Sequence, residues 1–442
     1  MAPDMAQRRT LFSQIDFIMF ASVMVMMAIG IMFIYSSGVT SKGDSVSTEW
    51  IRQLIWMTMG IVAMIGLSFV RYDLFREIAL FLFLGFLVMV IVASFMGRMV
   101  NGSRNWIGIG ELGIQPSEFL KIATILLLAV VVDGWGEKIR SLRYFALASG
   151  LVLVPMVIIL VQQDLGTSMV FVPIFFFMLF VGGANPRHLI YVLATILLSI
   201  FLIILVSWNQ YLLKVHLPFL AIFQDKTLFL ILAGSLAVLT AVSFIAWRIF
   251  HRTYFYYLTY IFSILLCAVI IQFLARAVLK PYQVKRLIVF LDPSFDAKGA
   301  GWNIIQSITA VGSGGMWGKG YLHGVQTHLQ FLPEQSTDFI FSILSEEWGF
   351  VGGLGVLVCY MVLLYRGLNI TMKARDTFGA LIAAGIVGMY FFHMLINVGM
   401  AIGVMPIVGI PLFFLSYGGS SLITAFIALG ILMSVNAHRY QF

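Results

Sequence analysis

The chain has 442 residues, of which 61% are hydrophobic and 10% are charged, whereas about a quarter of the residues of an ordinary soluble domain are charged. This composition excludes a sizeable water-soluble domain and indicates a multi-pass membrane protein. The formal net charge of +8 does not indicate nucleic-acid binding, because the short cytoplasmic loops of membrane proteins collect Lys and Arg for topological reasons.

Twelve apolar runs follow one another along the chain, and most are long enough to cross a bilayer core as a helix, which takes about 20 residues. They predict helices near residues 15–35, 52–70, 77–97, 117–133, 144–161, 167–183, 188–207, 227–250, 254–279, 338–364, 377–397 and 413–435. The first run follows Arg8 and Arg9, as in a signal peptide, but its length predicts a retained helix. We therefore expect an all-α polytopic fold, with residues 1–442 as one integral membrane domain.

The distribution of Lys and Arg predicts the orientation. If the N-terminus is cytoplasmic, every segment that then lies inside carries at least one Lys or Arg, in the short loops that fix orientation. Both termini are therefore expected in the cytoplasm, and residues 280–337 form a large extracytoplasmic loop. Trp302 and Trp317 in this loop argue against disorder.

Polar residues gather at the outer ends of the predicted spans, where an ionisable side chain suggests a functional site. The stretch "GSRNWIGIGELGIQPSEFLK" places Arg104 and Trp106 in an outer loop and lets a helix begin at Pro116. Glu118 and Lys121 are three residues apart and share one helix face. They form either a structural salt bridge, with the Lys121 side chain extending outward, or part of a functional site.

Two aspartates occupy similar positions. Asp164 lies in a short turn, where an aspartate before Gly-Thr is a common turn or cap residue. Asp338 begins a span and could likewise be a helix cap. However, a face of small and polar residues follows Asp338 at helical spacing, made of Ser342, Ser345, Gly349 and Gly353. Such a face allows close helix packing or lines a cavity.

The loop 280–337 also carries Arg286, Lys298 and Lys319. Together with a carboxylate at the membrane surface, these cations suggest that an anionic ligand is handled at the outer leaflet.

The stretch from Asn397 to Ser421 interrupts an apolar run with Pro406, Pro411 and the Gly418–Gly419 pair. Non-helical backbone at membrane depth is tolerated only where protein or a watery cavity surrounds it. We therefore expect this segment to fold back against a cavity that faces outward. Broken helices of this kind also occur in transporters, so a transport function stays open.

Taken together, these segments resemble the SEDS family (shape, elongation, division and sporulation), and its RodA-like elongation branch more than its division branch. The resemblance covers nearly the whole chain apart from about 208–280. It rests on five stretches in family order: "SRNWIGIGELGIQPSEFLK", "QQDLGTS", "FLDPSFDAKGAGWNIIQS", "GKGYLHGVQTHLQFLPEQSTDFIFSILSEEWGFVGG" and "PIVGIPLFFLSYGGSS".

The resemblance implies a peptidoglycan glycosyltransferase of the bacterial cytoplasmic membrane that polymerises lipid II at the outer leaflet during cell elongation. Lipid II is a disaccharide peptide linked to undecaprenyl pyrophosphate. The resemblance also implies a class B penicillin-binding protein as partner and a divalent cation, Mg²⁺ or Mn²⁺, for which the sequence shows no assignable ligand cluster. The family's essential aspartate lies in the motif that reads "TDFIF" here, which places it at Asp338.

The chemistry suggests roles for the other polar residues. A carboxylate such as Asp338 suits a general base that takes the proton from a sugar hydroxyl, and a leaving pyrophosphate needs positive charge. The cation candidates are Arg104, Lys121, Arg286 and Lys319. Supporting positions are expected at Glu118, Asp164 and Glu334, and Trp106 could stack on a sugar or lie against lipid headgroups.

The chain departs from the family pattern between Asn209 and Lys280. Family members usually have ten spans, whereas two further apolar runs here predict an inserted transmembrane hairpin at 227–279. Arg248 and Arg252 predict that its loop is cytoplasmic. Two alternatives to polymerisation stay open, a lipid II flippase and a scaffold for a penicillin-binding protein. The polar residues within the spans cluster at one side, which favours chemistry there.

Overall fold

The computed structural model describes residues 16–40, 47–100, 103–108, 113–211, 218–223, 225–278, 281–297, 299–329 and 331–440. The long helices are α1 (Phe17–Ser37), α2 (Glu49–Phe69), α3 (Leu74–Met96), α4 (Pro116–Trp135), α5 (Leu142–Val161), α6 (Leu165–Val181), α7 (Pro186–Tyr211), α8 (Lys226–Phe250), α9 (Thr253–Val278), α13 (Ile340–Met372), α14 (Thr377–Ala401) and α15 (Gly419–Ala437). The short elements include α10 (Pro281–Leu291), α11 (Ala300–Ser313), α12 (Val325–His328), and the strands β1 (Arg98–Val100) and β2 (Ser103–Trp106).

Eleven helices of the described residues are long and apolar enough to cross a membrane, and α6, with 17 residues, is a shorter apolar helix. Each of the twelve predicted spans overlaps one of these helices. The expected all-α polytopic fold is therefore confirmed.

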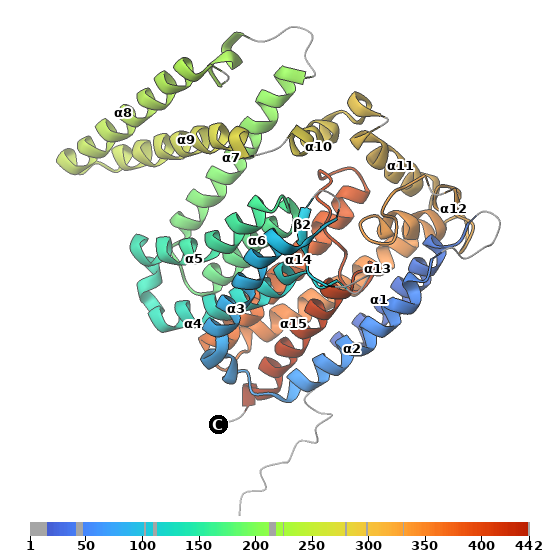
Figure 1. Ribbon diagram of the computed structural model, residues 1–442. Helices are drawn as coiled ribbons and strands as arrows, with labels where there is room; N and C mark the ends of the chain where they lie inside the picture. The colour runs from blue at the N-terminus through green and yellow to red at the C-terminus, as the bar shows by residue number, and fades with distance from the viewer. Residues whose placement is uncertain are drawn as a thin grey trace, which may run out of the picture. The chain divides into compact units, whose positions relative to one another are not determined.

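The chain divides into two compact units, one made of residues 1–184 and 305–442 and the other of residues 185–304. In the first unit α14 lies at the centre and packs against α4, α6, α13 and α15 (Figure 1). Most of its side chains are buried, whereas α2 and α3 expose apolar side chains such as Val62 and Phe81. This distribution suits an apolar solvent outside and close helix packing inside.

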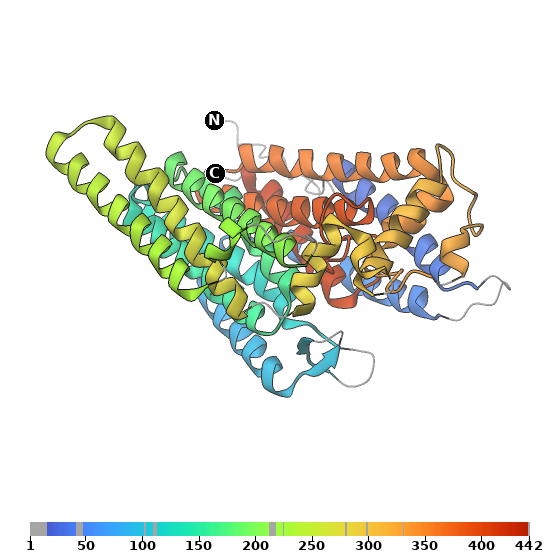
Figure 2. The same cartoon turned by 90° about the horizontal axis from the view of Figure 1, so that it is seen from above.

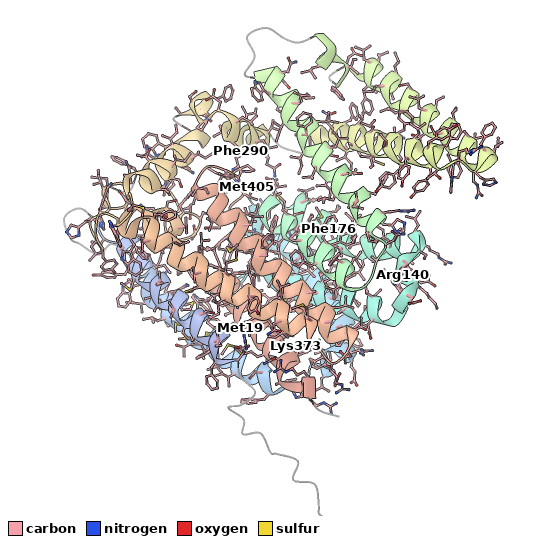
Figure 3. All side chains as sticks on the ribbon, turned by 180° about the vertical axis from the view of Figure 1, so that it is seen from behind. Met19, Arg140, Phe176, Phe290, Lys373 and Met405 are labelled. Carbon is pink, nitrogen blue, oxygen red and sulfur yellow. The ribbon has the colours of Figure 1, made fainter. Side chains whose placement is uncertain are left out.

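The ends of this bundle can be followed in Figure 3. Met19 of α1 and Lys373, which follows α13, lie at one end, and Met405, which follows α14, lies at the other. Asp338 and Lys121 are linked through Asn397 and His393 to residues 410 and 411, which follow Met405 closely in the chain.

The second unit contains a helical hairpin at the position of the predicted insertion. Helices α8 and α9 lie side by side along their length (Figures 1 and 2). His251 in the left-handed conformation (φ 50°) and Arg252 form the turn between them. The stacked rings of Phe229 and Phe273, with centroids 3.9 Å apart, hold the far ends together.

The predicted loop 280–337 is not structureless, because it contains α10, α11 and α12. Its first part belongs to the second unit and its part from Ile305 onward to the first. Lys298 lies outside the described residues.

The span predicted near 338–364 is interrupted. Gly349 has φ 66° and ψ −163°, which breaks α13 into a first part, Ile340–Trp348, and a second part from Phe350 to Met372. Only glycine adopts this backbone conformation easily. The N–H groups of Phe350 and Val351 donate to the carbonyl oxygens of Gly315 and Met316 instead of continuing the helix, at 2.8 and 3.1 Å.

The two parts have different surroundings. Side chains of the first part are almost all buried, whereas the second exposes an apolar face that includes Phe350, Leu354, Val358 and Met361. The second part alone has 23 residues, enough to cross a membrane. The first part is therefore a separate helical segment within the protein.

The span predicted at 413–435 begins only at Gly419, because the residues between α14 and α15 are not helical. In this connecting segment, residues 402–418, the stretch 412–416 is buried, whereas Ile402, Val404 and Gly409 are exposed. The segment's carbonyl oxygens accept hydrogen bonds from side chains: Ile410 from Asn397, Phe413 from Tyr360 and Ser416 from Gln53. Protein groups thus satisfy part of the non-helical backbone that the Pro and Gly residues predicted here.

Candidate active site

Asp338 lies in the turn before α13. The helix begins two residues later, at Ile340, and Phe339 occupies the N-cap position. The backbone N–H of Asp338 donates to the carbonyl oxygen of Glu334 at 3.1 Å. Glu334 itself is exposed and has a left-handed backbone (φ 51°), so the predicted supporting residue helps to shape the turn that holds Asp338.

Two further elements fix Asp338. The side-chain amide of Asn397, near the end of α14, donates to the carbonyl oxygens of Asp338 and Ile410, at 2.9 and 2.8 Å. On the carboxylate side lies Gly409, with φ 76°, where an added Cβ would be 3.3 Å from Oδ2 of Asp338. The Asp338 carboxylate therefore faces the connecting segment 402–418, at a position where a side chain would crowd it.

Glu118 and Lys121 form the predicted ion pair. Nζ of Lys121 lies 2.8 and 2.9 Å from the two carboxylate oxygens of Glu118 and 3.2 Å from Nε2 of His393 on α14. Glu118 is 3% exposed and Lys121 0%. An ammonium has three N–H donors, and these three contacts use all of them inside the protein. A direct contact between Lys121 and a pyrophosphate would require one of them to break.

The ion pair is connected to the connecting segment through His393. The Nδ1 atom of this histidine lies 2.9 Å from the carbonyl oxygen of Pro411. Its ring stacks on Phe413 with the centroids 3.7 Å apart. The Glu118–Lys121 pair thus positions His393, and His393 contacts the backbone of Pro411, two residues after Gly409.

Asp164 caps helix α6. Its carboxylate accepts hydrogen bonds from the backbone N–H and the hydroxyl of Thr167, both at 3.0 Å. It also accepts from the amides of Asn105 and Gln115, at 2.8 and 2.9 Å. This fits the interpretation of Asp164 as a cap residue and adds that it ties the strand β2 to α6.

The capped end of α6 also contacts the connecting segment. An added Cβ at Gly166 would lie 2.8 Å from the carbonyl oxygen of Val408, so the backbones approach closely here. Asp338, the Lys121–His393 pair and the start of α6 therefore meet along residues 408–411, which makes this short stretch the centre of the candidate site.

The other predicted residues lie elsewhere. Arg104 is exposed on β2, and the neighbouring Trp106 is half-buried, with its ring 2.9 Å from an added Cβ at Gly113. Arg286 belongs to α10 of the second unit. Lys319 binds the Glu346 carboxylate at 2.8 Å, so its charge is balanced within the protein.

Glu346 and Glu347 were not assigned by the sequence analysis, and both are fully buried at the break of α13. Glu346 accepts four hydrogen bonds: from Nζ of Lys319, the backbone N–H groups of Gln326 and Thr327, and the hydroxyl of Thr327. A buried carboxylate with this many donors is well satisfied. It fixes the segment 319–327 against the first part of α13.

Glu347 joins the same segment to α1. It accepts from the hydroxyl of Ser36 and from the backbone N–H of Leu322, the latter at 3.0 Å. Burial, together with the nearby Glu347 carboxylate, raises the pKa of the Tyr321 hydroxyl. That hydroxyl donates to the carbonyl oxygen of Met32 at 3.0 Å. The two glutamates thus hold in place the helical part that begins just after Asp338.

Replacing Glu346 with Ala should destabilise the protein strongly, because Lys319 and two backbone N–H groups would lose their acceptor. Removing one partner of a fully buried ion pair typically costs about 3–5 kcal/mol, and the cost should be lower here because the Lys319 side chain is 27% exposed. Thermal unfolding of the purified protein in detergent measures the loss. Glu137→Ala, at an exposed position, is the matched control and should stay within about 0.5 kcal/mol of wild type. Equal melting temperatures for Glu346→Ala and wild type would contradict this role.

His393 and Asn397 were missed as well. Both are polar, lie in an apolar run and are four residues apart, so they share one helix face. The rule that polar residues inside a span mark a site could have found them. Gly409 gave no such signal, because its importance depends on a contact with Asp338 from a distant part of the chain.

Among the described residues, no group of three or more His, Cys, Asp or Glu side chains could hold a metal ion.

The fold and the site define a multi-pass helical membrane protein with a fixed aspartate beside a broken helix. The sequence profile of the FtsW, RodA and SpoVE family, described as "Cell cycle protein", matches residues 16–227 and 208–441. The chain belongs to this family.

Named relatives match over nearly the full chain. One is the peptidoglycan glycosyltransferase RodA of Treponema pallidum (strain Nichols), 45% identical over 427 residues that cover 97% of this chain and 98% of the relative. Another is the stage V sporulation protein E of Bacillus subtilis (strain 168), 32% identical over 432 residues that cover 96% and 98%. A third is the peptidoglycan glycosyltransferase MrdB of Escherichia coli (strain K12), 31% identical over 388 residues that cover 88% and 85%.

Solved structures share the fold. A chain from a peptidoglycan synthase complex, in a study of how polymerization and crosslinking are coordinated, has a TM-score of 0.67 and 25% identity, with 97% of this chain and 99% of that chain covered. The rod shape determining protein RodA of Thermus thermophilus has a TM-score of 0.59 and 24% identity, with 97% and 98% covered. The expected family and its helical fold are thereby confirmed.

Proposed function

We propose that this chain is a peptidoglycan glycosyltransferase that polymerises lipid II into glycan strands at the outer face of the bacterial cytoplasmic membrane during cell elongation. Relatives that match over nearly the whole chain carry the name of this activity. The observation that carries the proposal is the fixed position of Asp338, between the Asn397 amide and the space beside Gly409.

Asp338 is the general base of the proposed reaction. Its carboxylate takes the proton of a sugar hydroxyl as that oxygen bonds to the anomeric carbon of the second substrate. The bond between the anomeric carbon and the pyrophosphate oxygen breaks, and undecaprenyl pyrophosphate leaves. A carboxylate suits this step because the hydroxyl becomes acidic only as the oxocarbenium-like transition state develops.

The cations have different parts in the proposal. Arg104 is exposed. Among the basic residues of the first unit, it is the one proposed to contact the leaving pyrophosphate. Lys121 and Lys319 are paired within the protein and act by holding the backbone around the site. Arg286 in the second unit stays a candidate, and Trp106, beside Arg104, is the proposed stacking surface for a sugar or a lipid headgroup.

A class B penicillin-binding protein is the proposed partner, because it would cross-link the strands that this chain makes. The similarity to a chain of a peptidoglycan synthase complex supports an assembly of this kind. The proposal also places both chain termini in the cytoplasm, following the distribution of Lys and Arg in the short loops.

Incubation of lipid II with the purified protein and its partner in detergent micelles tests the function. Micelles have no two leaflets, so transport cannot give a product there. We expect glycan strands to form, and to form more slowly after EDTA treatment if a divalent cation assists, with recovery on adding Mg²⁺ or Mn²⁺. Lipid II that stays unpolymerised in micelles but crosses liposome membranes would favour the flippase alternative, and inactivity in both assays would favour the scaffold.

A further inference from the structure

Three arginines lie at one end of the second unit. Arg248 is in the last turn of α8, Arg252 is in the turn that joins α8 to α9, and Arg187 is the second residue of α7. All three are exposed, and so is His251 between them. The contacts of Tyr260 bring α7 to this turn, because its hydroxyl donates to the carbonyl oxygen of Arg187 at 2.6 Å. We call Arg187, Arg248, His251 and Arg252 the arginine turn.

Acidic residues are scarce in the second unit. The sequence from 185 to 304 contains only Asp225, Asp292 and Asp296. Asp225 caps the opposite end of α8, roughly 35 Å away at a rise of about 1.5 Å per residue. The other two follow the far end of α9. The positive end of α7 adds to the charge at the turn, whereas the positive end of α9 and the negative end of α8 meet there and offset each other.

Aromatic side chains surround these arginines. The guanidinium of Arg187 lies over the ring of Tyr256, 5.8 Å from its centroid, and Tyr256 in turn contacts Trp247 and Tyr260. Next to them, large apolar or aromatic side chains are exposed, namely Ile249, Phe250, Tyr254 and Tyr257. Trp and Tyr beside exposed apolar residues are typical of the boundary between lipid tails and headgroups.

We propose that the arginine turn binds the headgroups of anionic phospholipids. A guanidinium pairs with a phosphate through two parallel hydrogen bonds, and clusters of Arg at the membrane surface attract anionic lipids. The exposed apolar side chains favour a lipid over an acidic protein in water, because they would contact the acyl chains of the same lipid molecules. The arginine turn therefore gives this chain a lipid site in the second unit.

The full-length protein, purified in an uncharged detergent, tests this by native mass spectrometry with added phosphatidylglycerol, cardiolipin or phosphatidylethanolamine. Wild type should retain the two anionic lipids preferentially. The variant Arg187→Gln/Arg248→Gln/Arg252→Gln should lose this preference, by about fivefold for each arginine if each acts as basic residues near a membrane surface do.

The control removes the same number of charges at another turn. Lys138→Gln/Arg140→Gln/Arg143→Gln changes exposed residues in the turn between α4 and α5 and in the first turn of α5. Glu137 supplies a negative charge in this turn (Arg140 is labelled in Figure 3). It should keep the preference for anionic lipids. Melting temperatures in lipid-free detergent show that both variants are folded.

Two results would overturn the proposal. One is an equal loss of anionic lipid in both triple variants, which would show a general effect of net charge. The other is an unchanged lipid preference in the arginine-turn variant, which would assign these cations to a different acidic partner or to topology alone.

Discussion

Asp338→Asn is expected to abolish glycan polymerisation and to leave the protein folded. Asn has nearly the same volume as Asp, but it cannot take a proton at neutral pH. Loss of a general base typically lowers a rate by about 10²–10⁴-fold. The backbone contacts of Asp338 with Asn397 and Glu334 do not involve its carboxylate, so they should survive. The polymerisation rate and the melting temperature of the purified variant measure the two effects.

Asp73→Asn is the matched control for this variant. Asp73 lies before α3 and pairs with Arg71 near the surface, at 3.0 Å. The same chemical change there should leave the polymerisation rate near that of wild type. A rate near wild type for Asp338→Asn would instead show that this aspartate is structural.

Glu118→Gln and Lys121→Met should each lower both stability and activity. Each leaves a buried charge without its partner, which typically costs about 3–5 kcal/mol. The double variant removes both charges and should recover most of the melting temperature. We expect it to stay slow in polymerisation, because His393 would lose its contact with the Lys121 ammonium. The position of residues 408–411 beside Asp338 would then be less well fixed.

Melting temperature and polymerisation rate are measured for both single variants and the double variant. Together they distinguish a pair that positions residues 408–411 from a pair that only stabilises the fold. A double variant that recovers stability without activity supports a positioning role of the pair. One that polymerises at the wild-type rate would show that the pair only holds the helices together.

Much of the fold could be predicted from the sequence because the membrane imposes simple rules. Apolar runs of sufficient length marked every long helix, and the Pro and Gly residues between 397 and 421 marked the non-helical segment. The spacing of Glu118 and Lys121 predicted their ion pair, since residues three apart on a helix are neighbours.

The remaining features depend on contacts between distant parts of the chain. The break at Gly349 is stabilised by hydrogen bonds to Gly315 and Met316. The residues next to Gly349 in the sequence do not predict these hydrogen bonds. Glu347 binds Ser36, 311 positions away. The carboxylates in the middle of an apparent span therefore could be noticed in the sequence, but their partners could not be identified. The same holds for Gly409, whose partner is Asp338.

The most direct test of the role of Asp338 measures lipid II binding and polymerisation together, in one preparation of wild type and of Asp338→Asn. Both proteins are expected to bind lipid II with similar affinity, and only wild type is expected to make glycan strands, since the carboxylate acts on the reacting hydroxyl. Glycan strands of normal length and rate from Asp338→Asn would contradict it.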